Sequence, residues 1–111
     1  MLGKLTETVY FCKEERKKTA TGAVSSILIK EYKVAASLEI KTEKILIGAR
    51  YNEVEIAELT TRYIDEVMNN AASYYVLYDN NVYSIKGKQV TRNSSVSPRY
   101  MKLRCLYERT N

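Results

Sequence analysis

Residues 74–85 read YYVLYDNNVYSI, with a short apolar run on each side of three consecutive Asp or Asn residues. Tyr, Val and Ile favour strands, and Asp79-Asn80-Asn81 favours a turn because these side chains tolerate the left-handed backbone conformation and hydrogen-bond to the backbone. This arrangement is typical of a β-hairpin. We therefore expect a β-rich fold that contains this hairpin.

The chain on the C-terminal side of the hairpin predicts one further strand. Residues 99–108 alternate between polar and apolar side chains, so we expect one face of this strand to pack in a core. The residues on that expected core face are Met101, Leu103, Cys105 and Tyr107. The polar, Ser-rich residues 86–98 that precede this strand are predicted to form a loop.

Three strands are predicted on the N-terminal side, over residues 5–12, 27–40 and 54–64. The first of them has apolar residues on one face, at Leu5, Val9 and Phe11. The second is long, and its alternation changes phase between Ile29 and Tyr32. A phase change of this kind predicts a bend or a β-bulge, as when a small sheet rolls into a barrel.

The other segments are predicted as connections. Residues 13–26 are polar and contain Gly22, which predicts an exposed hairpin loop. Residues 41–53 predict either a short helix or an excursion from the sheet, and residues 65–73 predict a polar loop with room for one helical turn. With about six strands, the chain is expected to be mainly β, a small antiparallel β-barrel or roll. It would carry a long inserted loop and at most one short helix, in a single domain over residues 1–111.

The composition excludes several kinds of active site. The chain has no His, so sites built on imidazole are excluded. Its four glycines form no phosphate-binding loop, and carboxylate pairs such as Glu53 and Glu55 are expected to be solvated charges. We predict that the chain is not an enzyme and has no catalytic residues, metal site, cofactor or small-molecule substrate.

Cys12 and Cys105 are the two cysteines of the chain. They are too few for a disulfide scaffold, so buried thiols in a reducing compartment are expected. Lys4 and Glu7 interrupt the first apolar residues, so no signal peptide is predicted. No stretch reaches the ~20 apolar residues that a membrane helix needs. We expect synthesis in a cytoplasm and no membrane partner.

The net charge of +5 comes from the C-terminal part of the chain. Residues 1–66 carry eleven basic and eleven acidic side chains, whereas residues 67–111 carry seven basic and two acidic ones. The basic-patch candidates are Lys86, Lys88, Arg92 and Arg99. With Tyr83 and Tyr100 nearby, they have the composition of a nucleic-acid contact. A solvated surface or contact with an acidic protein face explains the same charges, and the ten tyrosines favour a protein interface.

In their order, these strands resemble the phage head–tail joining family, whose members are also called head-closure or stopper proteins. The best match is residues 59–66, which read LTTRYIDE, followed after a spacer by the tyrosine-rich hairpin of residues 74–85. Residues 5–11 and 100–108 are similar to the first and last strands of the family. The resemblance covers nearly the whole chain.

This resemblance implies a β-barrel subunit of the neck of a virion or prophage particle. Copies would form a ring below the portal and its adaptor and above the tail proteins, and the ring would retain the packaged DNA. The resemblance further implies that residues 41–53 enter the central channel. The candidates for facing the channel or the DNA are Lys44, Ile45, Leu46, Ile47 and Arg50. Alternatively, the apolar residues of this segment cover an open end of the barrel.

Two other functions fit the same residues. Tail-terminator proteins of the neck share a small β-rich build. A cytoplasmic OB-like barrel that binds single-stranded nucleic acid would use the basic C-terminal part of the chain. The second function predicts salt-sensitive binding of oligonucleotides, which weakens when Lys86, Lys88 and Arg92 are neutralised.

Overall fold

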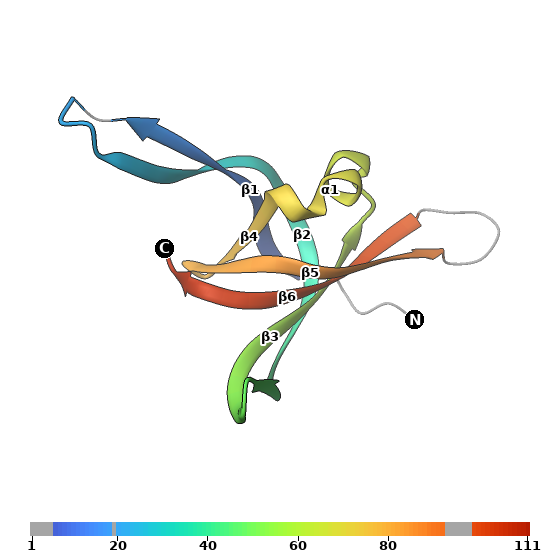
Figure 1. The fold of residues 1–111 in the computed structure, drawn as a ribbon. Helices are drawn as coiled ribbons and strands as arrows, with labels where there is room; N and C mark the ends of the chain where they lie inside the picture. Colours follow the sequence, from blue (N-terminus) through green and yellow to red (C-terminus); the bar gives the residue numbers. More distant parts are fainter. Residues whose placement is uncertain (1–5, 19, 93–98) are drawn as a thin grey trace.

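The computed structural model describes residues 6–18, 20–92 and 99–111, with the backbone alone for Lys17, Thr91, Arg92 and Arg99. The described strands are β1 (Glu7–Lys18), β2 (Val24–Ile47), β3 (Arg50–Arg62), β4 (Tyr74–Tyr78), β5 (Asn81–Arg92) and β6 (Arg99–Thr110). Between β3 and β4 lie the helix α1 (Asp65–Asn69) and the 3-10 turn η1 (Ala71–Ser73). The strands close an antiparallel barrel in the order β1-β2-β3-β6-β5-β4 (Figure 1). The predicted fold class is confirmed.

The hairpin of β4 and β5 turns at the predicted residues. Asp79 and Asn80 have positive φ angles of 48° and 64°, and Tyr78 pairs with Asn81 across this two-residue loop. Positive φ at both central residues is the geometry of a type I′ turn, whose twist matches that of the strands it joins. Asn81 therefore begins β5 rather than completing the turn.

The turn geometry predicts opposite effects of two substitutions at Asn80. Asn80→Ala is expected to lower the free energy of unfolding by about 1 kcal/mol, because a simple Cβ is strained at positive φ. Asn80→Gly, the matched control, should preserve or raise this free energy, because glycine adopts the conformation without steric cost. Urea unfolding of the two variants and the parent chain measures both effects. Equal stability of the two variants would contradict the assigned turn.

The barrel encloses the main hydrophobic core. On β6, the side chains of Met101, Leu103 and Cys105 are fully buried, as the alternation predicts. Other buried members of this core are Val9, Phe11, Ala36, Ala57, Leu59, Val67, Met68, Tyr74, Val76 and Tyr83. Val67 and Met68 belong to α1, so the helix packs its apolar side onto the barrel. Leu5, a predicted core residue, lies outside the described part of the chain.

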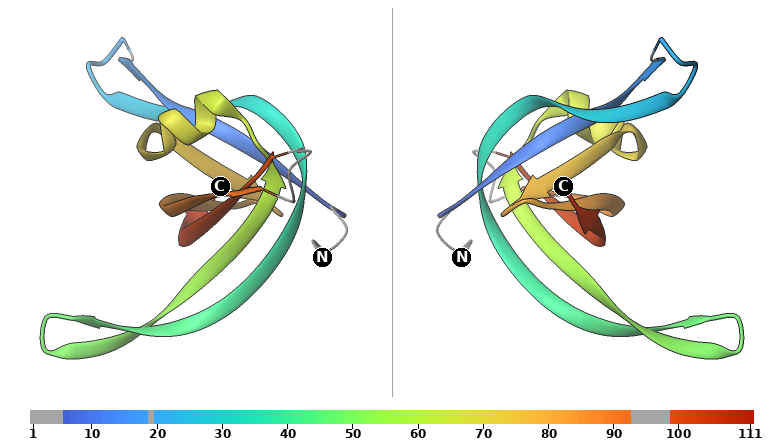
Figure 2. Two further views of the ribbon diagram at one scale, coloured as in Figure 1. Left: turned by 90° about the vertical axis from the view of Figure 1, so that its right-hand side faces the viewer. Right: turned by 90° about the vertical axis from the view of Figure 1, so that its left-hand side faces the viewer.

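β2 changes partner along its length. Its first half pairs with β1 and its second half with β3, and Ala36 pairs with both. The register with β1 shifts between Phe11 and Cys12, which leaves Glu31 as an extra residue on β2. This β-bulge confirms the change of phase predicted after Ile29. Bulges bend strands, and Figure 2 shows β2 curving around the barrel.

Several segments predicted as loops or excursions are strands. Most of residues 13–26 belong to the β1–β2 hairpin, residues 86–92 to β5, and residues 41–53 to a β2–β3 hairpin that turns at Gly48. The long insertion is therefore a two-stranded ladder and not a helix. Charged side chains suit it because both faces of such a ladder meet water. In residues 65–73, the helical turn is α1.

Cys12 and Cys105 are free thiols with no exposed surface, as expected. Burial raises the pKa of Cys105 to about 12 and also raises the pKa of Cys12. The thiolate is the reactive form of cysteine, so both side chains are inert toward reagents in neutral solution.

Candidate functional site

Two hairpins project from the barrel as two-stranded arms. The β1–β2 arm is residues 14–28, where β1 has passed the end of its pairing with β4 and pairs only with β2. The β2–β3 arm is residues 42–55, where β3 is not yet paired with β6 and pairs only with β2. The arms leave the barrel in different directions (Figure 1, Figure 2).

The arms and their bases carry most of the large exposed apolar side chains of the described residues. Seven of the eight such side chains lie there, and Val90 of β5 is the eighth. On the β1–β2 arm and its base they are Val24, Ile27 and Ile29, and on the β2–β3 arm and its base they are Ile40, Leu46, Ile47 and Tyr51. Exposed apolar residues that gather in this way mark surfaces of interaction.

Alternation along the strands divides the β2–β3 arm into an inner face, continuous with the barrel interior, and an outer face. From the base to the turn, the cross-strand pairs on the inner face are Ile40 and Ala57, Thr42 and Glu55, Lys44 and Glu53, and Leu46 and Tyr51. The outer face carries Glu43 and Val54, Ile45 and Asn52, and Ile47 and Arg50. The predicted channel residues are thus divided, with Lys44 and Leu46 on the inner face and Ile45, Ile47 and Arg50 on the outer face. Lys44 and Arg50 point to opposite sides of the arm.

Two ionic contacts lie at the base of this arm. Arg104 of β6 donates a hydrogen bond to the Glu43 carboxylate, and Lys41 Nζ lies 3.0 Å from Glu58 Oε1. The hydrogen bond from Lys41 lowers the pKa of Glu58. Exposed pairs of this kind contribute little stability.

Buried and half-buried tyrosine hydroxyls donate hydrogen bonds to carboxylates on the inward side of the barrel, and one of these carboxylates, Glu55, belongs to the β2–β3 arm. The hydroxyl-to-carboxylate hydrogen bonds run from Tyr83 to Glu55 at 2.7 Å, from Tyr74 to the bulge residue Glu31 at 2.7 Å, and from Tyr78 to Glu7 at 3.0 Å. Tyr83 and Tyr74 are each 1% exposed. Burial and then the hydrogen bond to glutamate raise the pKa of both hydroxyls. For Tyr78 the hydrogen bond is the larger cause of a raised pKa.

The raised tyrosine pKa values predict a loss of stability in alkali. Their contribution is fully present below the pKa of tyrosine in the unfolded chain, about 10, and is lost as the pH rises above that value. Tyr83→Phe should lower the free energy of unfolding by roughly 1–3 kcal/mol at neutral pH and flatten its alkaline decline. Tyr51→Phe, at a side chain that is 71% exposed, is the control and should do neither. Urea unfolding across the alkaline range tests this, and an unchanged decline in Tyr83→Phe would contradict it.

The basic-patch candidates differ in their contacts and in their exposure to solvent. Lys88 pairs with buried Leu103 and donates from Nζ to the carbonyl oxygen of Met68 at 2.7 Å, which links β5 to the end of α1. Lys86 is exposed where the β5 register shifts. Arg92 and Arg99 pair through their backbones, and their side chains lie outside the described part of the chain. Lys88 therefore has a structural contact with the end of α1, and this neutral acceptor leaves its positive charge in place.

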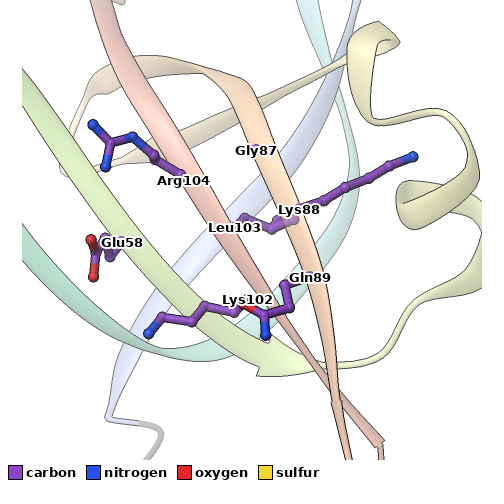
Figure 3. Close-up of a pocket in the computed structure, with 7 residues that line it drawn as sticks. All are labelled: Glu58, Gly87, Lys88, Gln89, Lys102, Leu103 and Arg104. Atoms are coloured by element: carbon purple, nitrogen blue, oxygen red, sulfur yellow. The ribbon is translucent and has the colours of Figure 1, made fainter.

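A shallow hollow on the outer face of β3, β5 and β6 gathers other polar side chains. Its lining is Glu58, Gly87, Lys88, Gln89, Lys102, Leu103 and Arg104 (Figure 3). In Figure 3 the side chain of Lys88 points away from Glu58, toward α1. Because Arg104 contacts Glu43 and Glu58 lies beside Lys102, the hollow is mixed in charge. A nucleic-acid backbone is bound by a surface that is predominantly cationic.

The exposed apolar side chains of the β1–β2 arm were not predicted from the sequence. The alternation predicts a strand through Ile27 and Ile29 but not that they stay in contact with water. The available signal is the charged run of residues 13–18, because Ile29 pairs with Lys13 and Ile27 with Glu15. A hairpin with so many charges on one strand is not buried by the same chain.

The described ranges of the chain contain no group of three or more Cys, Asp or Glu side chains placed to hold a metal ion. They also contain no helix that is long and apolar enough to cross a membrane.

No protein-family model and no curated protein matches this sequence. Among solved structures, the chain is similar to a chain in the virion of a native gene transfer agent particle, with a TM-score of 0.63 and 9% sequence identity. The similarity covers 99% of this chain and 100% of the other. At this identity the comparison shows a common fold, and it extends over the whole chain.

Proposed function

We propose that this chain is a structural subunit of a phage-like virion, and that its copies form a neck ring that closes the DNA-filled head and joins it to the tail. The observation that carries the proposal is the end-to-end similarity of its fold to a chain of a virion. The order of the strands and the tyrosine-rich hairpin, which resemble head–tail joining proteins, support the position in the neck. In this role the chain is made in the bacterial host cytoplasm and catalyses no reaction.

The arms support assembly with other copies of the chain. A ring of identical subunits needs two different contact surfaces on each subunit, one for each neighbour. The β1–β2 and β2–β3 arms are two different surfaces, and each exposes large apolar side chains. They leave the barrel in different directions, as contacts with two neighbours require (Figure 2).

Within the ring, the end of the β2–β3 arm faces the central channel. Arg50 lies beside the turn of this arm, on its outer face with Ile45 and Ile47. An exposed cation at that place attracts the phosphates of packaged DNA. The inner face, with Lys44 and Leu46, is then turned toward protein. Portal and adaptor proteins lie above the ring and tail proteins below it.

A tail-terminator ring is the nearest alternative, because it would use a similar subunit in the same neck. A barrel that binds single-stranded nucleic acid has less support. Arg104 is paired with the Glu43 carboxylate, which leaves one fewer free cation for phosphates. A flat oligonucleotide titration at low salt is expected.

Quantitative mass spectrometry of purified particles tests the proposed role. The particles come from a strain that encodes the chain and are separated from free protein by density-gradient centrifugation. The chain is expected in the particles, in a copy number comparable with that of the portal protein. Its absence would contradict a virion role. A copy number like that of the major capsid or tail-tube protein would retain a virion role and contradict the neck ring.

A further inference from the structure

The inner face of each arm, with its base, carries two large exposed apolar side chains, which form the apolar strip of that arm. On the β1–β2 arm and its base, Ile27 and Ile29 are 43% and 38% exposed. Ile29 pairs with Lys13, whose ammonium group lies 4.9 Å from the centre of the buried Tyr74 ring. This contact identifies the face of Ile29 as the one that continues the inward side of the barrel. The neighbouring Leu28 belongs to the opposite face, where it packs against a separate cluster around Cys12.

The β2–β3 arm has a matching strip. Leu46 and Tyr51 form a cross-strand pair on its inner face and are 57% and 71% exposed. Both strips therefore lie on the face that continues the inward side of the barrel, at the two ends of the same strand β2. On the β2–β3 arm, the pairs Thr42–Glu55 and Lys44–Glu53 lie between the strip and the barrel core. Exposed apolar side chains in such strips are stabilised when another surface covers them.

A single copy does not bring the two strips together. Ile27 lies near the start and Leu46 near the end of β2, a strand of 24 residues. The two arms leave the barrel in different directions in each of the views of Figure 2. Among the described residues, the two strips therefore do not cover each other within one copy.

The formal charges of the arms favour contact between unlike arms. The β1–β2 arm has three cations and two anions, a net charge of +1, from Arg16, Lys17, Lys18, Glu14 and Glu15. The β2–β3 arm has two cations and three anions, a net charge of −1, from Lys44, Arg50, Glu43, Glu53 and Glu55. Contact between two identical arms brings like charges together, whereas contact between unlike arms pairs opposite ones.

We propose that the inner face of the β1–β2 arm of one copy packs against the inner face of the β2–β3 arm of the next, with Ile27 and Ile29 against Leu46 and Tyr51. The partner that covers each strip is thus a second copy of this chain. The contact joins different surfaces, so it repeats from copy to copy and closes into a ring when the rotation permits. This inference rests on the proposed ring and specifies the surfaces that form it.

Cross-linking through introduced cysteines tests the contact. The variant Ile27→Cys/Leu46→Cys is made in the full chain, whose own two thiols are buried. It is treated with a short bismaleimide at high protein concentration and analysed by denaturing electrophoresis. A ladder of dimers, trimers and larger species is expected, because each copy links to two neighbours. A mixture of the two single variants should give dimers only.

Controls separate this contact from other modes of association. Each single variant treated alone should remain monomeric, and so should Ile27→Cys/Val90→Cys, whose second position is an exposed residue of β5. Dimers from Leu46→Cys alone would reveal contact between identical arms and overturn the proposal, as would an absence of cross-links in the double variant. If the chain is found in particles but the double variant gives no ladder, the contact fails and the virion role stands. If the double variant gives a ladder but the chain is absent from particles, the contact between copies stands and the virion role fails.

Discussion

A chain in which Asn-Gly replaces residues 44–53 is expected to fold and to fail in assembly. The deletion removes the end of the β2–β3 arm that is farthest from the barrel, with all five channel candidates and Tyr51. Glu43 pairs with Val54, so a two-residue type I′ turn closes the shortened hairpin in register. Because most of the deleted side chains are exposed, the free energy of unfolding should change by no more than about 1 kcal/mol. The number of tailed particles should fall to that of a strain without the gene.

The measurement is a count of tailed and tailless heads in electron micrographs of lysates, with urea unfolding of the purified chain as the check of folding. The matched control replaces only Gly48 and Ala49 with Asn-Gly, which changes the turn and keeps the arm. This control should give normal numbers of tailed particles. Normal numbers from the truncated chain would contradict a role of the arm in assembly.

Leu59→Ala is expected to lower the free energy of unfolding by about 2–5 kcal/mol. Leu59 has no exposed surface and stands between Leu38 of β2 and Leu103 of β6 on neighbouring strands. Its truncation leaves a cavity that a closed barrel cannot easily fill, because every strand is held by two neighbours. A loss of this size is a large fraction of the ~5–15 kcal/mol that stabilises an ordinary domain.

Leu46→Ala is the matched control for Leu59→Ala. It makes the same chemical change at a leucine that is 57% exposed on the arm, so the free energy of unfolding of the isolated chain should change by less than about 0.5 kcal/mol. Urea unfolding of both variants gives the comparison. Similar losses in the two variants would contradict the division of the apolar residues into a barrel core and an assembly surface.

The barrel was predictable from the sequence because its strands alternate clearly. Residues 99–108 bury Met101, Leu103 and Cys105 as their pattern indicates, and the Asx turn after β4 forms where the side chains favour positive φ. The change of phase after Ile29 corresponds to the bulge at Glu31. Each of these features depends on residues that are close in the sequence or on a strand with one buried face. Both can be recognised from the local order of polar and apolar residues.

The arms were not predictable as strands for a physical reason. Both faces of a two-stranded arm meet solvent, so residues 41–53 mix charges with Ile45, Leu46 and Ile47 and show no clean period. Their pairing is determined by the cross-strand ladder and by contacts with distant residues, such as Arg104 with Glu43. The hydrogen bond from Lys88 to α1 likewise joins residues that are far apart in the sequence.

Disruption of the gene, followed by electron microscopy of the particles released, tests the proposed neck role most directly. We expect DNA-filled or leaking heads without tails beside complete free tails, and recovery of tailed particles when the intact gene is supplied again. Overlong or irregular tails would instead indicate a tail terminator. Normal particles with tails attached would contradict the proposed role in joining head and tail.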